Sequence, residues 1–314
     1  MYPVPSKPPD VVCLGILVVD LFARPVERLP AKGTLELVDE IGMRGGGSAH
    51  NTATALVRLG LRAGAAGKVG ADTFGEFLLG LVNERGIDGR CVLVDRTVPT
   101  SASVVLLDSE GERTFLHLPG ANGHLRAEEL DRELLFSGRA LHLAGALVLD
   151  HLDGEPAAEI LAEAKRRGLQ TSLDTIFASG RWERVLPSLA YTDLFTPGLR
   201  EAQAITGEED PARAASWLRN RGVGEVIVTL GPEGCYASGA DFEGTVAPLD
   251  VEVVDGTGAG DAFAAGLIYG KLAGWPFERR VQLANAVGAL ATTAVGASEG
   301  VRGLEETLAL AGLA

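Results

Sequence analysis

Short apolar runs alternate with amphipathic stretches along most of the chain of 314 residues. In its central part the pattern predicts strands at RALHLAG, QTSLD, DLFTP and EVIVTLG. Helical periodicity falls between them, at residues 155–167, 182–189, 199–205 and 212–221. Strands that alternate with helices need crossover connections, which place the strands parallel to one another. The pattern therefore predicts a three-layer α/β domain with a mainly parallel central sheet.

The N-terminal third contains the exceptions to this alternation. Residues 1–10 are rich in proline and are expected to form a loose tail, and residues 11–22 predict one buried strand that ends near Asp20. Residues 26–42 alternate between apolar and charged positions, and residues 101–120 predict a hairpin that turns at Ser109-Glu110-Gly111. We expect these two segments to form a small antiparallel lid on a single domain spanning residues 11–314.

Two glycine-rich stretches each lead into a predicted helix. In MRGGGSAHNTATALVRLG, residues 43–60, three glycines would let a ligand approach the backbone, with Asn51 in the first helical turn. In the second, the apolar run from Val251 to Val254 predicts a strand end, and the helix follows from about Asp261. Free N–H groups at a helix start bind anions, and a carboxylate beside them could accept the proton of an attacking hydroxyl. The simpler alternatives are a flexible loop capped at Ser48 and a first-turn acid at Asp261.

Charge and cysteine usage narrow the classes of function. The formal net charge is −14 and no basic stripe interrupts it, which argues against nucleic-acid binding. Cys13, Cys91 and Cys235 lie far apart without a paired spacing, as expected for a reducing compartment. No apolar run reaches membrane-spanning length, and the first residues lack an apolar core typical of a signal peptide. We expect a cytoplasmic protein with no membrane or nucleic-acid partner.

The two glycine stretches also carry a resemblance. GGGSAHNTA at residues 45–53 and DGTGAGDAF at residues 255–263 resemble the two signature motifs of the ribokinase (PfkB-type) carbohydrate kinases, in the same order and spacing. The similarity runs from about Val11 to the C-terminus. It implies a ribokinase-like αβα sandwich with a β lid. It further implies transfer of the γ-phosphoryl group of ATP, with Mg²⁺, to a hydroxyl of a small sugar or sugar-like polyol.

The resemblance also implies roles for individual residues. Asp261 matches the catalytic base, and the amides of Gly258, Ala259 and Gly260 match the anion hole. The positions that match the sugar site are Asp20, Gly46, Gly47 and Asn51. Those that match the nucleotide site are Thr229, Gly231, Gly234, Asn285 and Glu201. A loop for a monovalent cation such as K⁺ is implied at Asp255, Thr257, Ala291, Ala294, Gly296 and Gly300. One position departs from the pattern, because Gly198 stands where the family commonly has an asparagine near Mg²⁺ and the phosphates.

Other functions fit these residues less well. A dinucleotide-dependent oxidoreductase is disfavoured because Asp261 takes the place of the third glycine of a G-x-G-x-x-G fingerprint. A sugar or nucleotide sensor would not need Asp261, and a nucleoside kinase would need more aromatic residues than Phe22, Phe115 and His117 near the sugar end. A phosphorylated sugar would need a cation in the first glycine motif, where Ser48 stands instead, although Arg44, Lys68 and Arg113 remain available elsewhere. We therefore favour an unphosphorylated sugar or polyol.

The lid also suggests a partner. It has free strand edges and apolar residues, among them Leu35, Leu37, Phe115 and Leu116. Sheet edges are usually covered. A homodimer through the lid would cover them.

Overall fold

The computed structural model describes residues 7–109, 113–176 and 180–314. Its main sheet is mostly parallel, and only the last two strands in chain order run antiparallel to their neighbours. From one edge to the other its strands in the described residues are β13 (Glu243–Val246), β12 (Cys235–Ser238), β11 (Glu225–Thr229), β10 (Leu194–Phe195), β9 (Gln170–Thr175), β8 (Ala140–Ala146), β1 (Val11–Gly15), β4 (Ala63–Gly70) and β5 (Asp88–Asp95).

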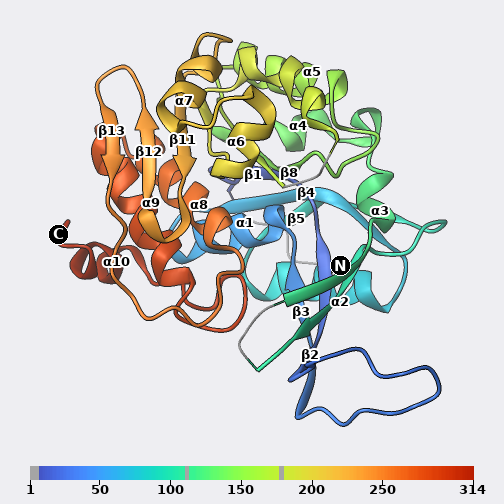
Figure 1. Cartoon of the computed structure of the whole chain (residues 1–314). Coiled ribbons are helices and arrows are strands. Elements are labelled where there is room, and N and C mark those ends of the chain that lie inside the picture. The colour runs from blue at the N-terminus through green and yellow to red at the C-terminus, as the bar shows by residue number, and fades with distance from the viewer. Residues whose placement is uncertain (1–6, 110–112, 177–179) are drawn as a thin grey trace.

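Helices cover both faces of this sheet, as Figure 1 shows. On one face pack α1 (Ser48–Arg58), α2 (Thr73–Glu84), α8 (Ala259–Leu272), α9 (Phe277–Ala291) and α10 (Leu304–Leu310). On the other pack α4 (Arg132–Leu135), α5 (Glu155–Arg166), the 3₁₀ helix η2 (Trp182–Tyr191), α6 (Leu199–Thr206) and α7 (Pro211–Arg219). Short turns complete the elements: α3 (Gly120–Gly123), η1 (Ala127–Glu129) and η3 (Gly231–Glu233).

Side chains of strand β1 pack into the hydrophobic cores on both faces of the main sheet. Val11 and Cys13 belong to the core under α1 and α8, whereas Val12 and Leu14 belong to the core under α5. Successive side chains of a strand point to opposite faces, so a strand covered on both sides must be apolar throughout. The expected three-layer α/β sandwich is confirmed.

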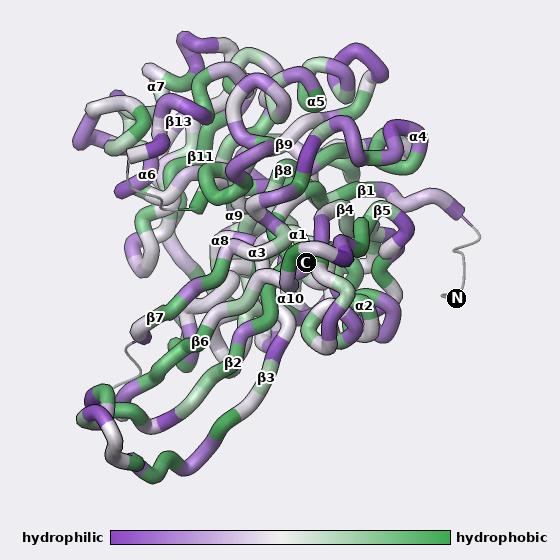
Figure 2. The backbone as a smooth tube through the Cα atoms, turned by 90° about the vertical axis from the view of Figure 1, so that its right-hand side faces the viewer, coloured by the Kyte–Doolittle hydropathy of each residue, from purple (hydrophilic) through white to green (hydrophobic). Residues whose placement is uncertain are grey.

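A second, smaller sheet projects from this body as a flap, seen at the lower left of Figure 2. Its order is β3 (Glu40–Gly46), β2 (Val18–Arg24), β6 (Ala102–Leu107) and β7 (Arg113–Leu118). The outer pairs β3–β2 and β6–β7 are antiparallel, and the central pair β2–β6 is parallel. We call these four strands the lid. The hairpin predicted for residues 101–120 is present, although part of its turn, residues 110–112, lies outside the described residues.

The bounds of the first lid segment differ from the prediction. The apolar run 11–22 is not one strand but two, β1 in the main sheet and β2 in the lid. The break follows Gly15, where a Cβ atom would lie 1.9 Å from the carbonyl oxygen of Ala144. Residues 25–39 carry no strand, since Pro25 and Pro30 have no N–H to donate to a neighbouring strand. Asp20 therefore lies within the lid, not at the end of a core strand.

Three further expectations need correction. The run Val251–Val254 is not a strand: the N–H groups of Val254 and Asp255 both donate to the carbonyl of Thr292, at the end of α9. Strands β5, β12 and β13 were not predicted. Residues 1–6 of the expected tail lie outside the described residues, and Pro9 and Asp10 pack on the body, where Asp10 pairs with Arg62 at 2.7 Å. In the part of the chain that the structure describes, every helix is too short or too polar to span a bilayer.

Candidate functional site

The second glycine turn opens directly into α8. Gly258 caps this helix in the left-handed conformation, with φ of 73°, and a Cβ atom there would lie 2.1 Å from the carbonyl oxygen of Ala297. Only glycine fits such a position. The amides of Gly258, Ala259 and Gly260 stand at the helix start, where N–H groups have no intrahelical acceptor. The helix dipole adds to their attraction for an anion.

Asp261 lies in the first turn of α8 and is 9% exposed. Its Oδ2 atom accepts a hydrogen bond of 2.8 Å from Nδ2 of Asn51 on α1. Burial raises the pKa of Asp261, while hydrogen bonds from Asn51 and Ser48 oppose the increase. This contact joins the two glycine turns, which are more than 200 positions apart in sequence.

The first glycine turn brings the lid to the same place. A Cβ atom at Gly46 would lie 2.2 Å from Oδ2 of Asp20, and one at Gly47 would lie 2.4 Å from the carbonyl oxygen of Ile16. These glycines therefore make room for the carboxylate of Asp20 and for the backbone between β1 and β2. Burial raises the pKa of Asp20 to about 6, although a hydrogen bond with Ser103 acts in the opposite direction.

Two further carboxylates, Asp174 and Glu201, belong to this region, and the sequence interpretation missed Asp174. Asp174 is buried at the end of β9. Burial, followed by the charges of Asp261 and Glu201, raises the pKa of Asp174 well above the ordinary range. The signal that drew attention to Asp20, a carboxylate after an apolar run, was also present in QTSLD. Open α/β sheets bind ligands at this end of their strands.

The predicted nucleotide residues divide into two groups. Thr229, Gly231 and Glu201 line an open cleft together with Gly198, Leu199, Arg200 and Leu230. Its empty space of about 660 Å³ includes open solvent and suits a small-molecule site. Oε2 of Glu201 accepts hydrogen bonds from the N–H of Gly198, at 2.8 Å, and from Oγ1 of Thr175, at 3.0 Å. A Cβ atom at Gly198 would meet only ordinary contacts, the nearest at 3.5 Å, so close packing does not require glycine at this position.

Gly234 and Asn285 do not line this cleft. A Cβ atom at Gly234 would lie 2.2 Å from the carbonyl oxygen of Val246, and Nδ2 of Asn285 donates to the carbonyls of Val246 and Ala247, at 3.3 and 3.1 Å. Both residues thus have a structural reason to be where they are, which is to hold the end of β13.

The predicted cation loop has its carboxylate already engaged. Oδ1 of Asp255 accepts from the N–H of Thr257 at 2.9 Å and from Nη1 of Arg113 at 3.3 Å, and Oδ2 accepts from the N–H of Gly296 at 2.9 Å. Burial opposes ionisation of Asp255, but these hydrogen bonds and the Arg113 charge together lower its pKa. Gly300 packs against the carbonyl oxygen of Ala291, and Ala294 is half-buried. In this arrangement the side chain of Asp255 does not fit a monovalent cation unless Arg113 moves away.

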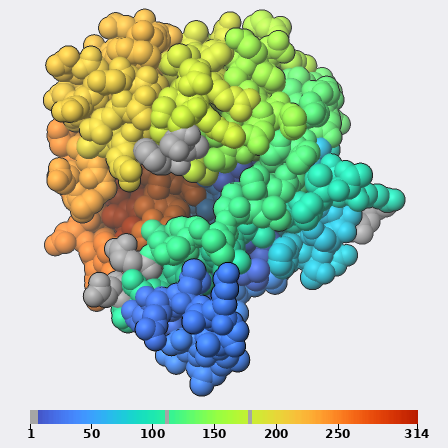
Figure 3. All heavy atoms as spheres, turned by 45° about the vertical axis from the view of Figure 1, so that its right-hand side comes forward, coloured from blue at the N-terminus to red at the C-terminus, as the bar shows by residue number. Residues whose placement is uncertain are grey.

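A second cleft lies between the lid and this loop. It is lined by Asp20, Phe22, Arg24, Arg44, Gly45, Val105, Leu107, Arg113, Phe115, Asp255, Thr257, Val295, Gly296 and Ala297. Its empty space of about 540 Å³ includes open solvent. Figure 3 shows a hollow between the blue-green lid and the yellow-to-orange part of the body. A ligand there would lie beside the glycine turn that precedes Asp261.

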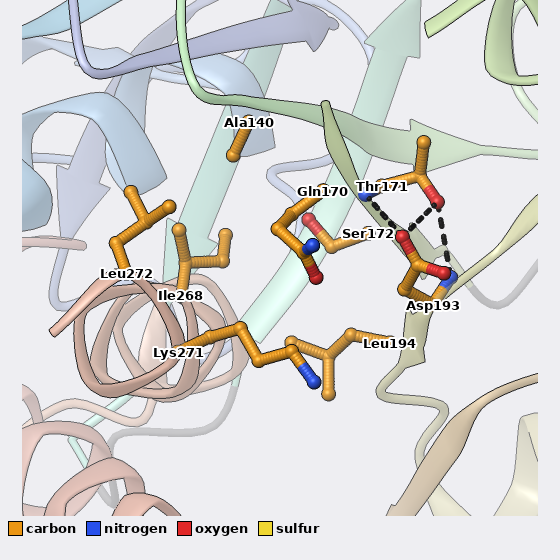
Figure 4. Close-up of a pocket in the computed structure, with 9 residues that line it drawn as sticks. All are labelled: Ala140, Gln170, Thr171, Ser172, Asp193, Leu194, Ile268, Lys271 and Leu272. Carbon is orange, nitrogen blue, oxygen red and sulfur yellow. Dashed lines mark hydrogen bonds between the residues drawn. The ribbon is translucent and has the colours of Figure 1, made fainter. Parts of the chain in front are cut away.

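A third pocket has no comparable chemistry. It lies near the starts of β8 and β9 and is drawn in Figure 4. Its charged groups have partners: Asp193 accepts from the N–H of Thr171 at 3.0 Å, and Lys271 pairs with Glu225, also at 3.0 Å. These contacts explain the residues structurally.

Comparison with known proteins agrees with this geometry. The model of the "pfkB family carbohydrate kinase" matches residues 8–302. This chain belongs to that family. It is 30% identical over 302 residues to "Probable fructokinase-2" of Arabidopsis thaliana, a match that covers 90% of this chain and 91% of the relative. It is 31% identical over 269 residues to the 2-dehydro-3-deoxygluconokinase of Bacillus subtilis, covering 81% and 82% of the two chains.

Solved structures support the same family. An E. coli protein described as a "putative Ribokinase II in complex with ATP and Mg+2" superposes with a TM-score of 0.83 at 26% identity, covering 96% of this chain and 98% of its own. The ribokinase-like fold and the activity of an ATP-dependent carbohydrate kinase follow for this member of the pfkB family.

Some carboxylates of this kinase could contribute part of the ligand set of a Mg²⁺ ion. Among the described residues, no three His, Cys, Asp or Glu side chains form a group that could hold a metal ion. Asp174, Glu201 and Asp261 nevertheless lie close enough for their charges to raise the pKa of Asp174. Mg²⁺ commonly keeps several waters and binds one or two carboxylates together with substrate phosphates. The residues present fit that mode, with Glu201 and Asp174 on the protein side.

Proposed function

We propose that this carbohydrate kinase transfers the γ-phosphoryl group of ATP to a hydroxyl of a small sugar or sugar-like polyol bound between the lid and Asp261. The observation that carries the proposal is the hydrogen bond between Asn51 and Asp261. It brings the carboxylate of the second glycine turn against the helix that follows the first. A nucleotide in the cleft at Glu201 and a sugar beneath the lid would then meet at α8.

The chemistry follows from what each group can do. Asn51 holds Oδ2 of Asp261 in place, so that the carboxylate can face and accept the proton of the attacking hydroxyl. The amides of Gly258, Ala259 and Gly260 would stabilise the charge on the phosphoryl group in transfer. Mg²⁺, when bound, neutralises the phosphates. Asp20 would accept a hydrogen bond from another hydroxyl of the sugar and so fix its orientation.

The same cleft disfavours a nucleoside. A nucleobase would stack on an aromatic face, and the cleft offers Phe22 and Phe115. The Arg44 guanidinium already lies 4.4 Å from the centre of the Phe22 ring, and that of Arg113 lies 5.9 Å from the centre of the Phe115 ring. A sensor without catalysis is disfavoured because burying the carboxylate of Asp261 is energetically unfavourable, and a protein that only binds ligands has no need of a buried carboxylate there.

A screen of acceptors tests the proposal. Release of ADP is measured with ATP and Mg²⁺ over pentoses, hexoses, ketoses, sugar acids and nucleosides. We expect turnover with a sugar or polyol. Turnover only with nucleosides, or none with any acceptor while ATP and sugar still bind, would overturn the proposal.

We also propose that the lid forms a homodimer and that residues 11–314 act as one domain. The outer face of the lid exposes Ile41 and Met43 from β3 and Leu116 and Leu118 from β7, with Ile41 74% exposed. An apolar sheet face with free edges is usually covered, and a second lid offers a matching surface. Sedimentation at micromolar concentration should show a dimer that Leu116→Lys dissociates, and a monomer would contradict this part of the proposal.

A further inference from the structure

Three arginines from three strands of the lid converge on the cleft beneath it. Arg24 lies on β2, Arg44 on β3 and Arg113 on β7. The protein as a whole carries a formal net charge of −14, so this local gathering of cations runs against its overall balance. A neutral sugar would give these groups no counter-charge.

Two of the three arginines have carboxylate partners within the protein. Arg24 pairs with Glu40 at 2.6 Å, and Arg113 pairs with Asp255 at 3.3 Å. These two positive charges are balanced before any ligand binds. They line the cleft without offering an unpaired charge.

Arg44 differs from both. Among the described residues it forms no ion pair with a carboxylate. Its guanidinium instead stacks on the Phe22 ring, with Cζ 4.4 Å from the ring centre. That contact orients the planar guanidinium without using its N–H groups. A Cβ atom at Gly296 would lie 3.2 Å from Nη1 of Arg44, so a larger residue on the opposite wall would crowd this end of the side chain.

Asp20 and Arg44 share one face of the lid. They are direct partners in the β2–β3 register, and both line the cleft. Residues opposite each other on antiparallel strands project to the same side. They nevertheless form no ion pair of 4.0 Å or less, although both belong to the described residues. Among the described residues, this face thus presents a hydroxyl acceptor beside a cation that has no ion-pair partner.

Resting on the proposed function of this site, we infer that the acceptor sugar carries an anionic group, a carboxylate or a phosphate ester, which Arg44 binds while Asp20 receives a hydroxyl. The planar fork of a guanidinium matches the paired oxygens of either group. Closing the lid over a neutral polyol would partly desolvate Arg44 without giving it a direct ion-pair partner, which is unfavourable. An anionic substituent removes that cost.

The test compares matched acceptors. For each sugar that is turned over, kcat and KM are measured for the neutral parent, its sugar acid and its phosphate monoester, with the wild type, Arg44→Gln and Arg44→Lys. Arg166→Gln on α5 removes the same charge far from the cleft and controls for net charge. Circular dichroism and binding of ATP show that each variant is folded.

We expect the wild type to prefer one anionic acceptor, and the arm that is preferred identifies the group as carboxylate or phosphate. Arg44→Gln should lower kcat/KM for that acceptor by about 10- to 100-fold, mainly through KM, and should cause a much smaller loss for the neutral parent. Arg44→Lys should retain part of the preference, and Arg166→Gln all of it.

Turnover of neutral sugars with no preference for an anion, or equal losses for both acceptors in Arg44→Gln, would overturn this inference and leave the proposed kinase function standing. Failure of every sugar, neutral or anionic, would overturn both.

Discussion

At the scale of single residues, the site is a set of carboxylates held out of water near one another. Asp261, Asp174 and Glu201 all have raised pKa values, and burial is the first cause in each case. The charges of Asp261 and Glu201 also disfavour ionisation of Asp174. Such a cluster is unfavourable until a cation or a metal–nucleotide complex enters, which is consistent with a site that binds Mg²⁺ and ATP together.

This cluster predicts the acid side of the pH–rate profile. A base works only when ionised, so kcat/KM should fall as pH drops through the raised pKa of Asp261. Burial and the charge of Asp261 raise the pKa of Asp174, so Asp174 should still be protonated while Asp261 ionises, and Asp174→Asn should leave the midpoint of this fall nearly unchanged. Profiles of both enzymes with the same sugar check this. A midpoint that moves to lower pH in Asp174→Asn would show that Asp174 is ionised over this range and would contradict the assignment.

Asp20 offers a second test at this scale. In Asp20→Ala a sugar hydroxyl loses its acceptor in a partly closed site, a loss of about 1–3 kcal/mol. The KM for sugar should therefore rise strongly while the KM for ATP changes little. Steady-state kinetics with each substrate varied in turn measures both. An equal rise in the two constants would mean that Asp20 supports the structure instead of contacting the sugar.

At the scale of elements, the lid and the glycine turn before α8 are tied together by Arg113. Its guanidinium donates to Asp255 and Thr257, so a strand of the lid reaches the turn that carries the proposed anion hole. Movement of the lid would therefore disturb the amides beside Asp261. A monovalent cation at Asp255 would have to take the place that Arg113 holds.

This competition predicts how K⁺ acts. We expect K⁺ to raise kcat more in Arg113→Ala, where Oδ1 of Asp255 has lost one donor, than in the wild type. The assay compares K⁺ with a large organic cation at constant ionic strength. Arg113→Lys, which keeps the charge, is the control and should behave more like the wild type. The same response to K⁺ in all three enzymes would contradict competition at this loop.

The sequence predicted those elements whose signal lies within a few consecutive residues, and it missed those that depend on distant parts of the chain. Helix starts at Ser48 and Ala259 were visible because glycine runs and apolar periodicity meet there. The transfer of the chain from β1 to the lid was not visible, because an unbroken apolar run does not show where one sheet ends and another begins. The β-branched residues around Val253 predict a strand, but the structure leaves them exposed outside any sheet, because β propensity depends strongly on context.

At the scale of the whole molecule, the order of strands and helices was predictable, but contacts between distant segments were not. The contact of Asn51 with Asp261 depends on how α1 and α8 pack. The partners of Asp255 depend on where the lid lies. The family resemblance indicated which residues to compare, and the folded chain shows which neighbours each of them has.

The sheet interior also predicts a dependence of stability on pH. His142 lies in the centre of β8, and burial lowers its pKa from 6.5 to about 4, while a bond with Ser172 acts in the opposite direction. The unfolded chain therefore binds a proton between these two pH values that the folded chain does not. The contribution of neutral His142 to the free energy of unfolding is therefore fully present above pH 6.5 and is lost as the pH falls towards 4.

The variant His142→Leu should remove this loss. Its free energy of unfolding should decrease less than that of the wild type between pH 6.5 and pH 4, by up to about 3 kcal/mol. Urea denaturation at several pH values measures the difference. Parallel curves for the two proteins would mean that His142 does not titrate differently in the folded and unfolded states.

The central claim is that Asp261 accepts the proton of the sugar hydroxyl. Asp261→Asn keeps the size of the side chain and its position at the start of α8, but an amide cannot take a proton. Positioned acid–base groups contribute about 10²- to 10⁴-fold. The account predicts that kcat for the accepted sugar falls by at least about 10²-fold, while calorimetry shows that sugar and ATP still bind. A kcat close to that of the wild type, with both ligands bound, would contradict it.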